Sequence, residues 1–156
     1  MKNLTFTILF MIVSTAMFSQ TKVGLQAAYG TNSEIGIGAK ASFRISDKFR
    51  ASPSFNYFFG ESVQGASSSV IGINADAHYI LSDKDGLSFY PLAGLNLTRS
   101  SATVLGISAS VTEIGFNVGG GLNYDLSSSL TGVFETKYIL SAFDQAVFSV
   151  GLLYNF

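Results

Sequence analysis

The sequence predicts an all-β protein, an eight-stranded antiparallel up-and-down transmembrane β-barrel. Three observations support this prediction. Apolar residues alternate with small or polar residues along most of the chain, which is the pattern of strands with two different faces. Short clusters of turn residues separate the alternating segments. Only 12% of the residues are charged, about half of the fraction usual in soluble proteins.

The first segment has the layout of an export signal. Lys2 supplies a positive charge, residues 4–13 are apolar, and small residues follow them. The apolar stretch is too short to span a bilayer as a helix. We therefore expect residues 1–19 to be a signal peptide cleaved near Ser19–Gln20, and residues 20–156 to form the barrel domain.

From residue 22 onward, the alternation divides into eight segments. In residues 35–45, for example, Ile, Ala and Phe alternate with Gly, Lys, Ser and Arg. Each segment is long enough for a tilted strand that crosses a membrane, which needs about 9–11 residues. The predicted strands are residues 22–30, 35–45, 49–59, 70–81, 87–98, 111–124, 130–140 and 146–156.

Two kinds of connection alternate along the chain. Turns rich in Ser, Asp and Gly are short, whereas the other connections are longer and include two long ones, residues 60–69 and 99–110. The first of these is rich in Gly and Ser, so we expect it to be a mobile loop. The second contains the apolar run Val104–Ile107, which indicates either a hairpin extending beyond the membrane or a contact site. The short turns are residues 46–48, 82–86 and 125–129, and the remaining longer connections are 31–34 and 141–145.

Two prolines interrupt the expected pattern. Pro53 and Pro91 fall on the apolar face within predicted strands. Proline cannot donate a backbone hydrogen bond, and in sheets it is found mainly at edges or bulges. Because a closed barrel has no edge, we expect local β-bulges at both positions.

The composition of the weaker face indicates which face points inward. That face carries mostly Gly, Ser and Asn, whereas the other carries Ile, Leu, Val, Phe and Tyr. A soluble lipocalin-type barrel also alternates, but its outer face is rich in charged residues. A narrow eight-stranded lumen accepts small side chains. The sequence therefore predicts apolar residues facing lipid and small or polar residues facing the lumen.

The chain resembles a known family in four features. These are its export signal, its eight alternating strands, its short turns opposite longer connections, and its ending Val150–Phe156. It is similar to the small outer-membrane β-barrel proteins of Gram-negative bacteria, the OmpX-like and OmpA transmembrane-domain class, over the whole mature chain. The resemblance implies location in the cell outer membrane, with the termini and short turns in the periplasm. It also implies, as partners, outer-membrane lipid and, during biogenesis, the assembly machinery and periplasmic chaperones. Phe156, Tyr154 and Leu152 would form the assembly signal.

Four charged residues at lumen-facing positions of the predicted strands are candidates for a functional or structural site. Lys40, Asp76, Glu135 and Lys137 lie at a similar distance from the short turns, counted along their strands. Buried charges are normally paired, so we expect an ion-pair network that fills the lumen. The alternative is a proton or ion path. Arg44, Arg50 and Glu113 also fall at lumen-facing positions of their predicted strands.

Other chemistry is sparse in this sequence. There is no cysteine and one histidine, and the formal net charge is −1, so we expect no metal site, no cofactor and no nucleic-acid partner. His78 could form a hydrolytic pair with Asp76 or with lumen serines. The alternative is a hydrogen-bonded lumen residue that faces Tyr90 across a hairpin.

The leading functional hypothesis is therefore a structural or surface-interaction role in the outer membrane. Binding residues concentrate on connections held by a rigid scaffold, so an extracellular ligand would contact residues 60–69 and 99–110. The second hypothesis is a narrow pore or transporter for small or hydrophobic molecules. The third is an outer-membrane enzyme, although we do not expect enzymatic activity.

Overall fold

The protein is described by a computed structural model that covers residues 21–63, 66–142 and 144–156. The signal peptide predicted for residues 1–19 lies outside these described residues. No helix in the described ranges is long and apolar enough to cross a membrane. The strands are β1 (Thr21–Gly30), β2 (Glu34–Arg44), β3 (Phe49–Val63), β4 (Ala66–Tyr79), β5 (Ser82–Lys84), β6 (Leu87–Val104), β7 (Ile107–Asp125), β8 (Leu130–Leu140) and β9 (Gln145–Asn155).

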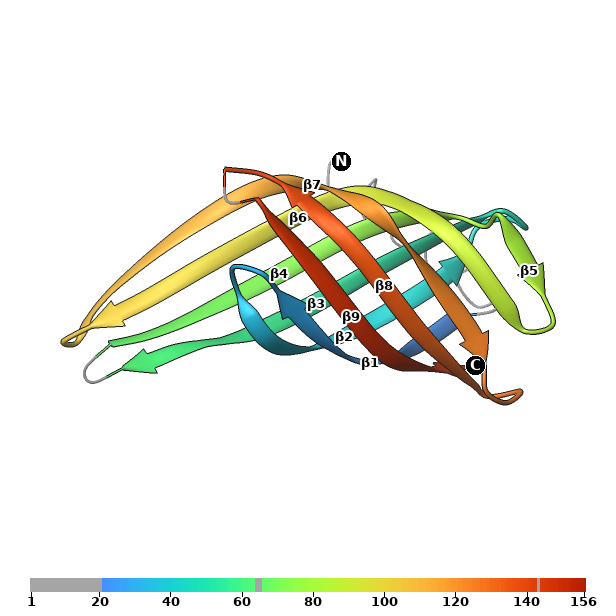
Figure 1. Ribbon diagram of the computed structural model, residues 1–156, viewed down its shortest axis with the longest axis horizontal. Helices are drawn as coiled ribbons and strands as arrows, with labels where there is room; N and C mark the ends of the chain where they lie inside the picture. The colour runs from blue at the N-terminus through green and yellow to red at the C-terminus, as the bar shows by residue number, and fades with distance from the viewer. Residues whose placement is uncertain (1–20, 64–65, 143) are drawn as a thin grey trace, which may run out of the picture.

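The strands form one antiparallel sheet that closes on itself (Figure 1). Neighbouring long strands pair in chain order, and β1 pairs with β9 to join the two ends of the chain. The short strand β5 pairs only with the beginning of β6, so β4 pairs directly with β6. Closure pairs the backbone polar groups that lipid could not satisfy. The eight long strands thus confirm the predicted up-and-down barrel.

Burial alternates along the strands as predicted. In β1, Gln26 and Ala28 are buried in the lumen, whereas Leu25 and Tyr29 point outward and are exposed. The outward faces of the other long strands carry Ile, Leu, Val, Phe and Tyr. Large apolar side chains that are exposed around a closed barrel are covered by lipid in a membrane. The apolar-out assignment is therefore confirmed.

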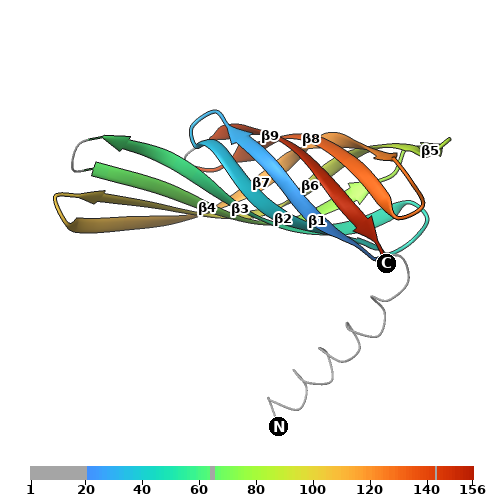
Figure 2. The same ribbon diagram turned by 90° about the horizontal axis from the view of Figure 1, so that it is seen from below.

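Strands occupy most of the two long connections, so the mobile loop predicted for residues 60–69 is wrong, whereas the extended hairpin predicted for residues 99–110 is confirmed. Residues 60–63 and 66–69 belong to β3 and β4, and residues 99–104 and 107–110 belong to β6 and β7. As a result β3, β4, β6 and β7 continue beyond the hairpins β1–β2 and β8–β9 (Figures 1 and 2). We call this four-stranded extension the protruding sheet. We call its end of the barrel the hairpin end, and the end with the short turns the turn end.

The tip of the β6–β7 hairpin explains why the strands could extend so far. Leu105 and Gly106 both have positive φ, 49° and 84°, as in the tight two-residue turns whose twist matches paired strands. Val104 and Ile107 on either side of the turn are already paired. Turns of this kind favour Asn or Asp at the first position. Leu105 gave no such signal in the sequence.

The two prolines have different effects on the pairing. At Pro53 the β2–β3 and β3–β4 registers are the same on both sides, so the predicted bulge is absent. The Ser52 hydroxyl donates a 2.9 Å hydrogen bond to the Ala41 carbonyl, which lies opposite the proline and would otherwise lack its donor. Beside Pro91, the pairing with β6 shifts by one residue between the end of β4 and β5, as expected for a bulge.

Candidate functional site

A layer of charged side chains crosses the middle of the lumen. Lys40 on β2 forms an ion pair with Glu135 on β8, and both side chains are only 3% exposed. Two residues further along β8, the Lys137 ammonium lies 2.8 Å from a carboxylate oxygen of Asp76 on β4. The four residues therefore contribute two positive and two negative charges. Each charge has a partner on a different wall of the barrel, as a buried charge requires.

Asparagine amides extend this layer toward the hairpin end. The Asn117 amide donates to Asp76, at 2.6 Å, and to the side-chain oxygen of Asn74, at 2.9 Å. Asn96 donates to the same Asn74 oxygen at 2.9 Å, and Asn74 in turn donates to Ser54 at 3.2 Å. The amides thus connect β3, β4, β6 and β7 inside the lumen, so the charged layer is part of a longer polar network.

His78 lies in the same layer and is almost fully buried. One ring nitrogen is 3.4 Å from a Glu135 oxygen. The imidazole stacks on Tyr90, with ring centroids 4.3 Å apart and planes 9° from parallel. The Tyr90 hydroxyl lies 3.0 Å from the side-chain amide of Asn123. The histidine is therefore enclosed by a carboxylate and an aromatic ring.

Glycines make room for the charged side chains. Each of the four charged residues has a glycine as a direct cross-strand partner. A Cβ atom added to Gly94 would lie 2.4 Å from the Asp76 carboxylate, and one added to Gly121 would lie 2.6 Å from Cγ of Glu135. A Cβ atom added to Gly24 or Gly119 would first meet the backbone of the neighbouring strand, at Leu152 and Thr136, so close strand packing also requires glycine on this face. The pairs are Lys40 with Gly24, Asp76 with Gly94, Glu135 with Gly121, and Lys137 with Gly119.

Apolar side chains lie on both sides of the charged layer. Toward the hairpin end, a cluster from four strands packs with the partly buried Val70, and a second cluster lies toward the turn end. A polar cavity beside Lys137 has a volume of about 10 Å³, roughly the space that one water needs. The first cluster is Ala28, Phe58, Ile139 and Val147, and the second is Ile80, Tyr90 and Leu92.

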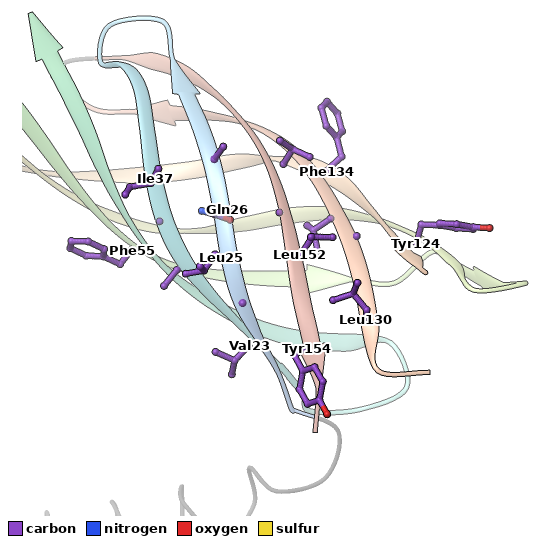
Figure 3. Close-up of a pocket in the computed structure, with 18 of the residues that line it drawn as sticks. Val23, Leu25, Gln26, Ile37, Phe55, Tyr124, Leu130, Phe134, Leu152 and Tyr154 are labelled. Carbon is purple, nitrogen blue, oxygen red and sulfur yellow. The ribbon is translucent and has the colours of Figure 1, made fainter. Parts of the chain in front are cut away.

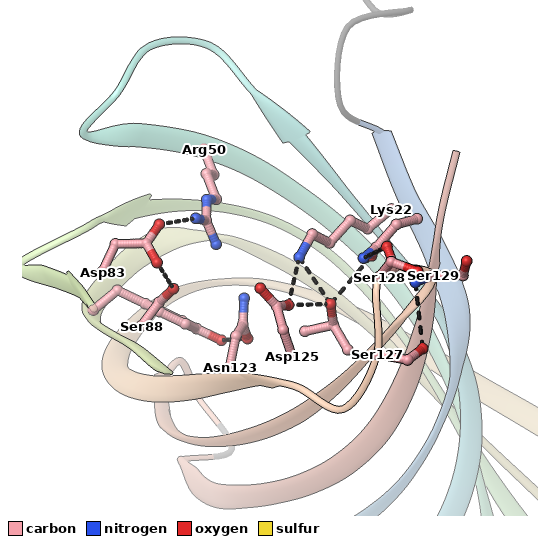
Figure 4. A network of polar contacts seen from close by, with 12 residues as sticks. Lys22, Arg50, Asp83, Ser88, Asn123, Asp125, Ser127, Ser128 and Ser129 are labelled. Atoms are coloured by element: carbon pink, nitrogen blue, oxygen red, sulfur yellow. Dashed lines mark hydrogen bonds and ion pairs between the residues drawn. The ribbon is translucent and has the colours of Figure 1, made fainter. Parts of the chain in front are cut away.

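A separate polar network surrounds the mouth of the lumen at the turn end (Figure 4). The Lys22 ammonium donates to Asp125 at 3.1 Å and to Thr131 at 2.8 Å. The Arg50 guanidinium donates to Asp83 at 3.1 Å. These pairs line a cavity of about 170 Å³, so this mouth, unlike the middle of the lumen, has room for several waters.

The structure thus brings together Lys40, Asp76, Glu135 and Lys137, the four residues selected from the sequence. It places Arg50 in the polar network around the mouth of the lumen. Arg44, the last residue of β2, forms an ion pair with Asp47 in the following turn, and the half-buried Glu113 lies opposite Thr98 on β6. Asn117 and the hydrogen bonds among the asparagine amides were not predicted from the sequence, although Asn74 and Asn117 fall at lumen-facing positions of their strands. Within the described part of the chain, no group of three His, Cys, Asp or Glu side chains could hold a metal ion.

The three C-terminal residues of the expected assembly signal share one outward face. Leu152 and Tyr154 are about half exposed, and Phe156 is 79% exposed. The Tyr154 and Phe156 rings contact each other edge to face, with centroids 5.1 Å apart. The Phe156 backbone amide donates to the Thr21 carbonyl at 3.0 Å, which extends the pairing that closes the barrel.

Comparison with known proteins identifies the family. A family model for the outer membrane protein beta-barrel domain matches residues 10–156. No curated protein gives a significant match.

Several solved structures share the fold. The N-terminal β-barrel domain of Pseudomonas aeruginosa OprF has a TM-score of 0.72 and 15% identity, over 88% of this chain and 97% of that one. Ail, the attachment invasion locus protein of Yersinia pestis, has a TM-score of 0.64 and 15% identity, over 90% and 100%. Neisserial surface protein A has a TM-score of 0.64 and 19% identity, over 88% and 95%. The chain therefore belongs to the outer membrane protein β-barrel domain family and is a protein of the Gram-negative outer membrane.

Proposed function

We propose that this protein is a non-conducting barrel that holds the protruding sheet at the cell surface for interaction with other molecules. The observation that carries the proposal is the extension of four strands beyond a barrel whose lumen is occupied by its own side chains. As the family resemblance implies, the turn end faces the periplasm and the hairpin end faces outside.

The packing inside the barrel supports a plugged lumen. Charged side chains pair across it, apolar clusters lie on both sides of them, and the polar cavity beside Lys137 has room for about one water. A pore for small solutes needs a continuous wetted path, which this packing disfavours. A transporter for hydrophobic molecules would have to move them past two buried ion pairs.

The environment of His78 supports a role other than catalysis. Its side chain is only 1% exposed and lies between Glu135 and Tyr90. A substrate could not reach the imidazole without displacing the stacked ring. A structural role in the plug explains this placement more simply than hydrolysis does.

The protruding sheet has the features of an interaction surface. Among the residues that the structure describes, β3 beyond Phe58 pairs with β4 alone, and residues 107–114 of β7 pair with β6 alone. Both outer edges therefore present backbone groups that another strand could pair with. At the tip, the side chains of Leu105 and Ile107 are 85% and 78% exposed. Exposed apolar groups of this kind mark contact sites, and the surface role is consistent with the name of Ail.

The first prediction concerns the ion pairs. Asp76→Asn keeps the side-chain shape but leaves the Lys137 ammonium buried without its carboxylate, so we expect a loss of about 3–5 kcal/mol in the free energy of unfolding. Combining it with Lys137→Met should restore much of that loss. Urea unfolding of protein refolded in detergent measures both. As a control, Asp83→Asn at the more exposed rim should cost at most about 1 kcal/mol, and equal effects at Asp76 and Asp83 would contradict the proposed network.

The second prediction concerns conductance. The purified protein, reconstituted in a planar lipid bilayer, should give no steady openings of porin size, because paired side chains occupy the lumen. A porin with more strands, reconstituted in the same way, serves as the positive control. Steady openings in every preparation of this protein would show that the lumen is not plugged.

The third prediction concerns the tip of the protruding sheet. Leu105→Asn together with Ile107→Thr removes the apolar side chains while keeping Gly106 and a favourable turn sequence. We expect cells that display this variant to attach to protein-coated surfaces and to each other less than cells with the unchanged protein. Leu126→Asn, in a turn at the opposite end, is the matched control. If cells with the unchanged protein, with either variant or with no protein all attached equally, a surface role for the tip would be excluded.

The fourth prediction concerns assembly. Phe156→Ala should reduce the amount of protein in the outer membrane several-fold, because we propose that the assembly machinery binds this C-terminal face. In refolded protein the same change should alter stability by no more than about 0.5 kcal/mol, since the side chain is largely exposed. Ile45→Ala, an exposed apolar residue at the same end, should change neither quantity. If Phe156→Ala left the assembled amount unchanged, the C-terminal signal would be ruled out.

A further inference from the structure

The outer wall of the barrel is hollowed on one side. A groove of about 1170 Å³ runs over β1, β2, β8 and β9 and reaches the nearest part of β3 and β7 (Figure 3). Its lining is formed almost entirely by apolar side chains that point outward, such as Leu25 and Leu152, together with strand backbone. A closed barrel is convex, so a hollow on its outside requires an uneven distribution of side-chain size.

The pairing register shows where this unevenness comes from. One outward row across six strands has aromatic rings at both ends, Leu25 and Leu152 in the middle, and one small residue on either side of this leucine pair. Ala39 and Gly132 hold the recessed positions in this row. The next row toward the hairpin end has Tyr57 at one end, Phe134 near the other, and the small residue Ala27 between Ile37 and Val150. The first row consists of Phe55, Ala39, Leu25, Leu152, Gly132 and Tyr124.

The groove covers only one half of the membrane-spanning wall. Along β1 its outward lining begins at Val23 and ends at Ala27, and Tyr29 is outside it. Four residues of strand correspond to about 13 Å, or about 10 Å along the membrane normal at a strand tilt of about 40°, which is somewhat less than half of the apolar band of about 25 Å. The half is the one at the turn end, where Tyr124 and Tyr154 lie at the margin of the groove (Figure 3).

We propose that this groove is a specific site for one phospholipid of the periplasmic leaflet. Its acyl chains would lie over Ala27, Ala39 and Gly132 between the aromatic side chains, and its head group would accept hydrogen bonds from the hydroxyls of Tyr124 and Tyr154. Tyrosine suits this position because its ring is apolar and its hydroxyl is polar. The proposal depends on insertion in the outer membrane but not on the role of the protruding sheet.

The shape of the groove favours a lipid over a second copy of the chain. Two copies related by a two-fold axis present the same surface to each other. For such a contact to pack, Ala39 and Gly132 of each copy would have to receive protruding side chains of the other copy without gaps. Acyl chains are thin and flexible, and they are the medium that surrounds this wall. They fill such a hollow without any matching protrusion.

Filling the groove tests the proposal. Ala39→Phe places a ring over the floor, and Gly132→Leu does so from β8, where an added Cβ meets its nearest atoms at ordinary contact distances of 3.6 and 3.7 Å. Ala93→Phe is the matched control, because Ala93 also points outward but lies on β6, outside the groove. All three positions leave the charged layer untouched.

The measurement is native mass spectrometry of the whole protein in mild detergent with added palmitoyl-oleoyl phosphatidylethanolamine. We expect one retained lipid per unchanged protein and per Ala93→Phe protein. Each methylene that loses its contact should weaken binding about fourfold, so Ala39→Phe and Gly132→Leu should lower retention by about tenfold or more. Equal loss in Ala93→Phe, or no retained lipid in the unchanged protein, would overturn the proposal. The proposal would also be overturned if the unchanged protein formed dimers and only Ala39→Phe and Gly132→Leu abolished them.

A second pair of variants tests the head-group contact. Tyr124→Phe with Tyr154→Phe removes two hydroxyls and leaves the rings, so the groove keeps its shape. Retention of the phospholipid should fall, whereas retention of palmitic acid methyl ester, which lacks the phosphate, should not. Equal retention of the phospholipid before and after the change would show that these tyrosines do not hold its head group.

Discussion

The narrowness of an eight-stranded lumen is the constraint on which the rest of this structure depends. Such a barrel has just enough interior for side chains, and a charge placed there needs a partner. Here each central charged residue sits beside a glycine of the neighbouring strand. That arrangement lets Lys40 and Asp76 reach Glu135 and Lys137 on β8. The ion pairs therefore join walls that no backbone hydrogen bond connects.

Outside the barrel, the medium around the strands decides which residues their outward faces carry. Within the membrane, a row across β4, β6 and β7 consists of Ile73, Leu97 and Ile114. Two rows further toward the hairpin end, the same face has serine on all three strands, Ser69, Ser101 and Ser110. Lipid requires closed pairing, whereas water can satisfy an open edge. The protruding sheet can therefore continue with two unpaired edges after the other four strands have ended.

The sequence was sufficient to predict the closed barrel and which face of each strand points outward, because both follow from counting residues along alternating segments. Strand ends were harder to predict. Residues 66–69 and 99–103 are rich in Ser and Thr, which also form loops, and only pairing between distant segments makes them strands. The bulge expected at Pro53 is absent because the Ser52 side chain replaces the missing backbone donor. The pairing of Lys40 with Glu135 depends on contacts across the lumen, which strand patterns do not contain.

With the plugged lumen that we propose, the outer surfaces are the places where this protein would bind other molecules. The four long strands carry the protruding sheet outside the membrane, and the four shorter strands carry most of the groove in the other half of the wall. Substitutions on these surfaces do not touch the charged layer, so binding can change without the loss of a buried pair. A substitution at Asp76 or Glu135 does the opposite, since each carboxylate contacts side chains from two other strands. The fold thus separates the residues that stabilise the barrel from those available for recognition.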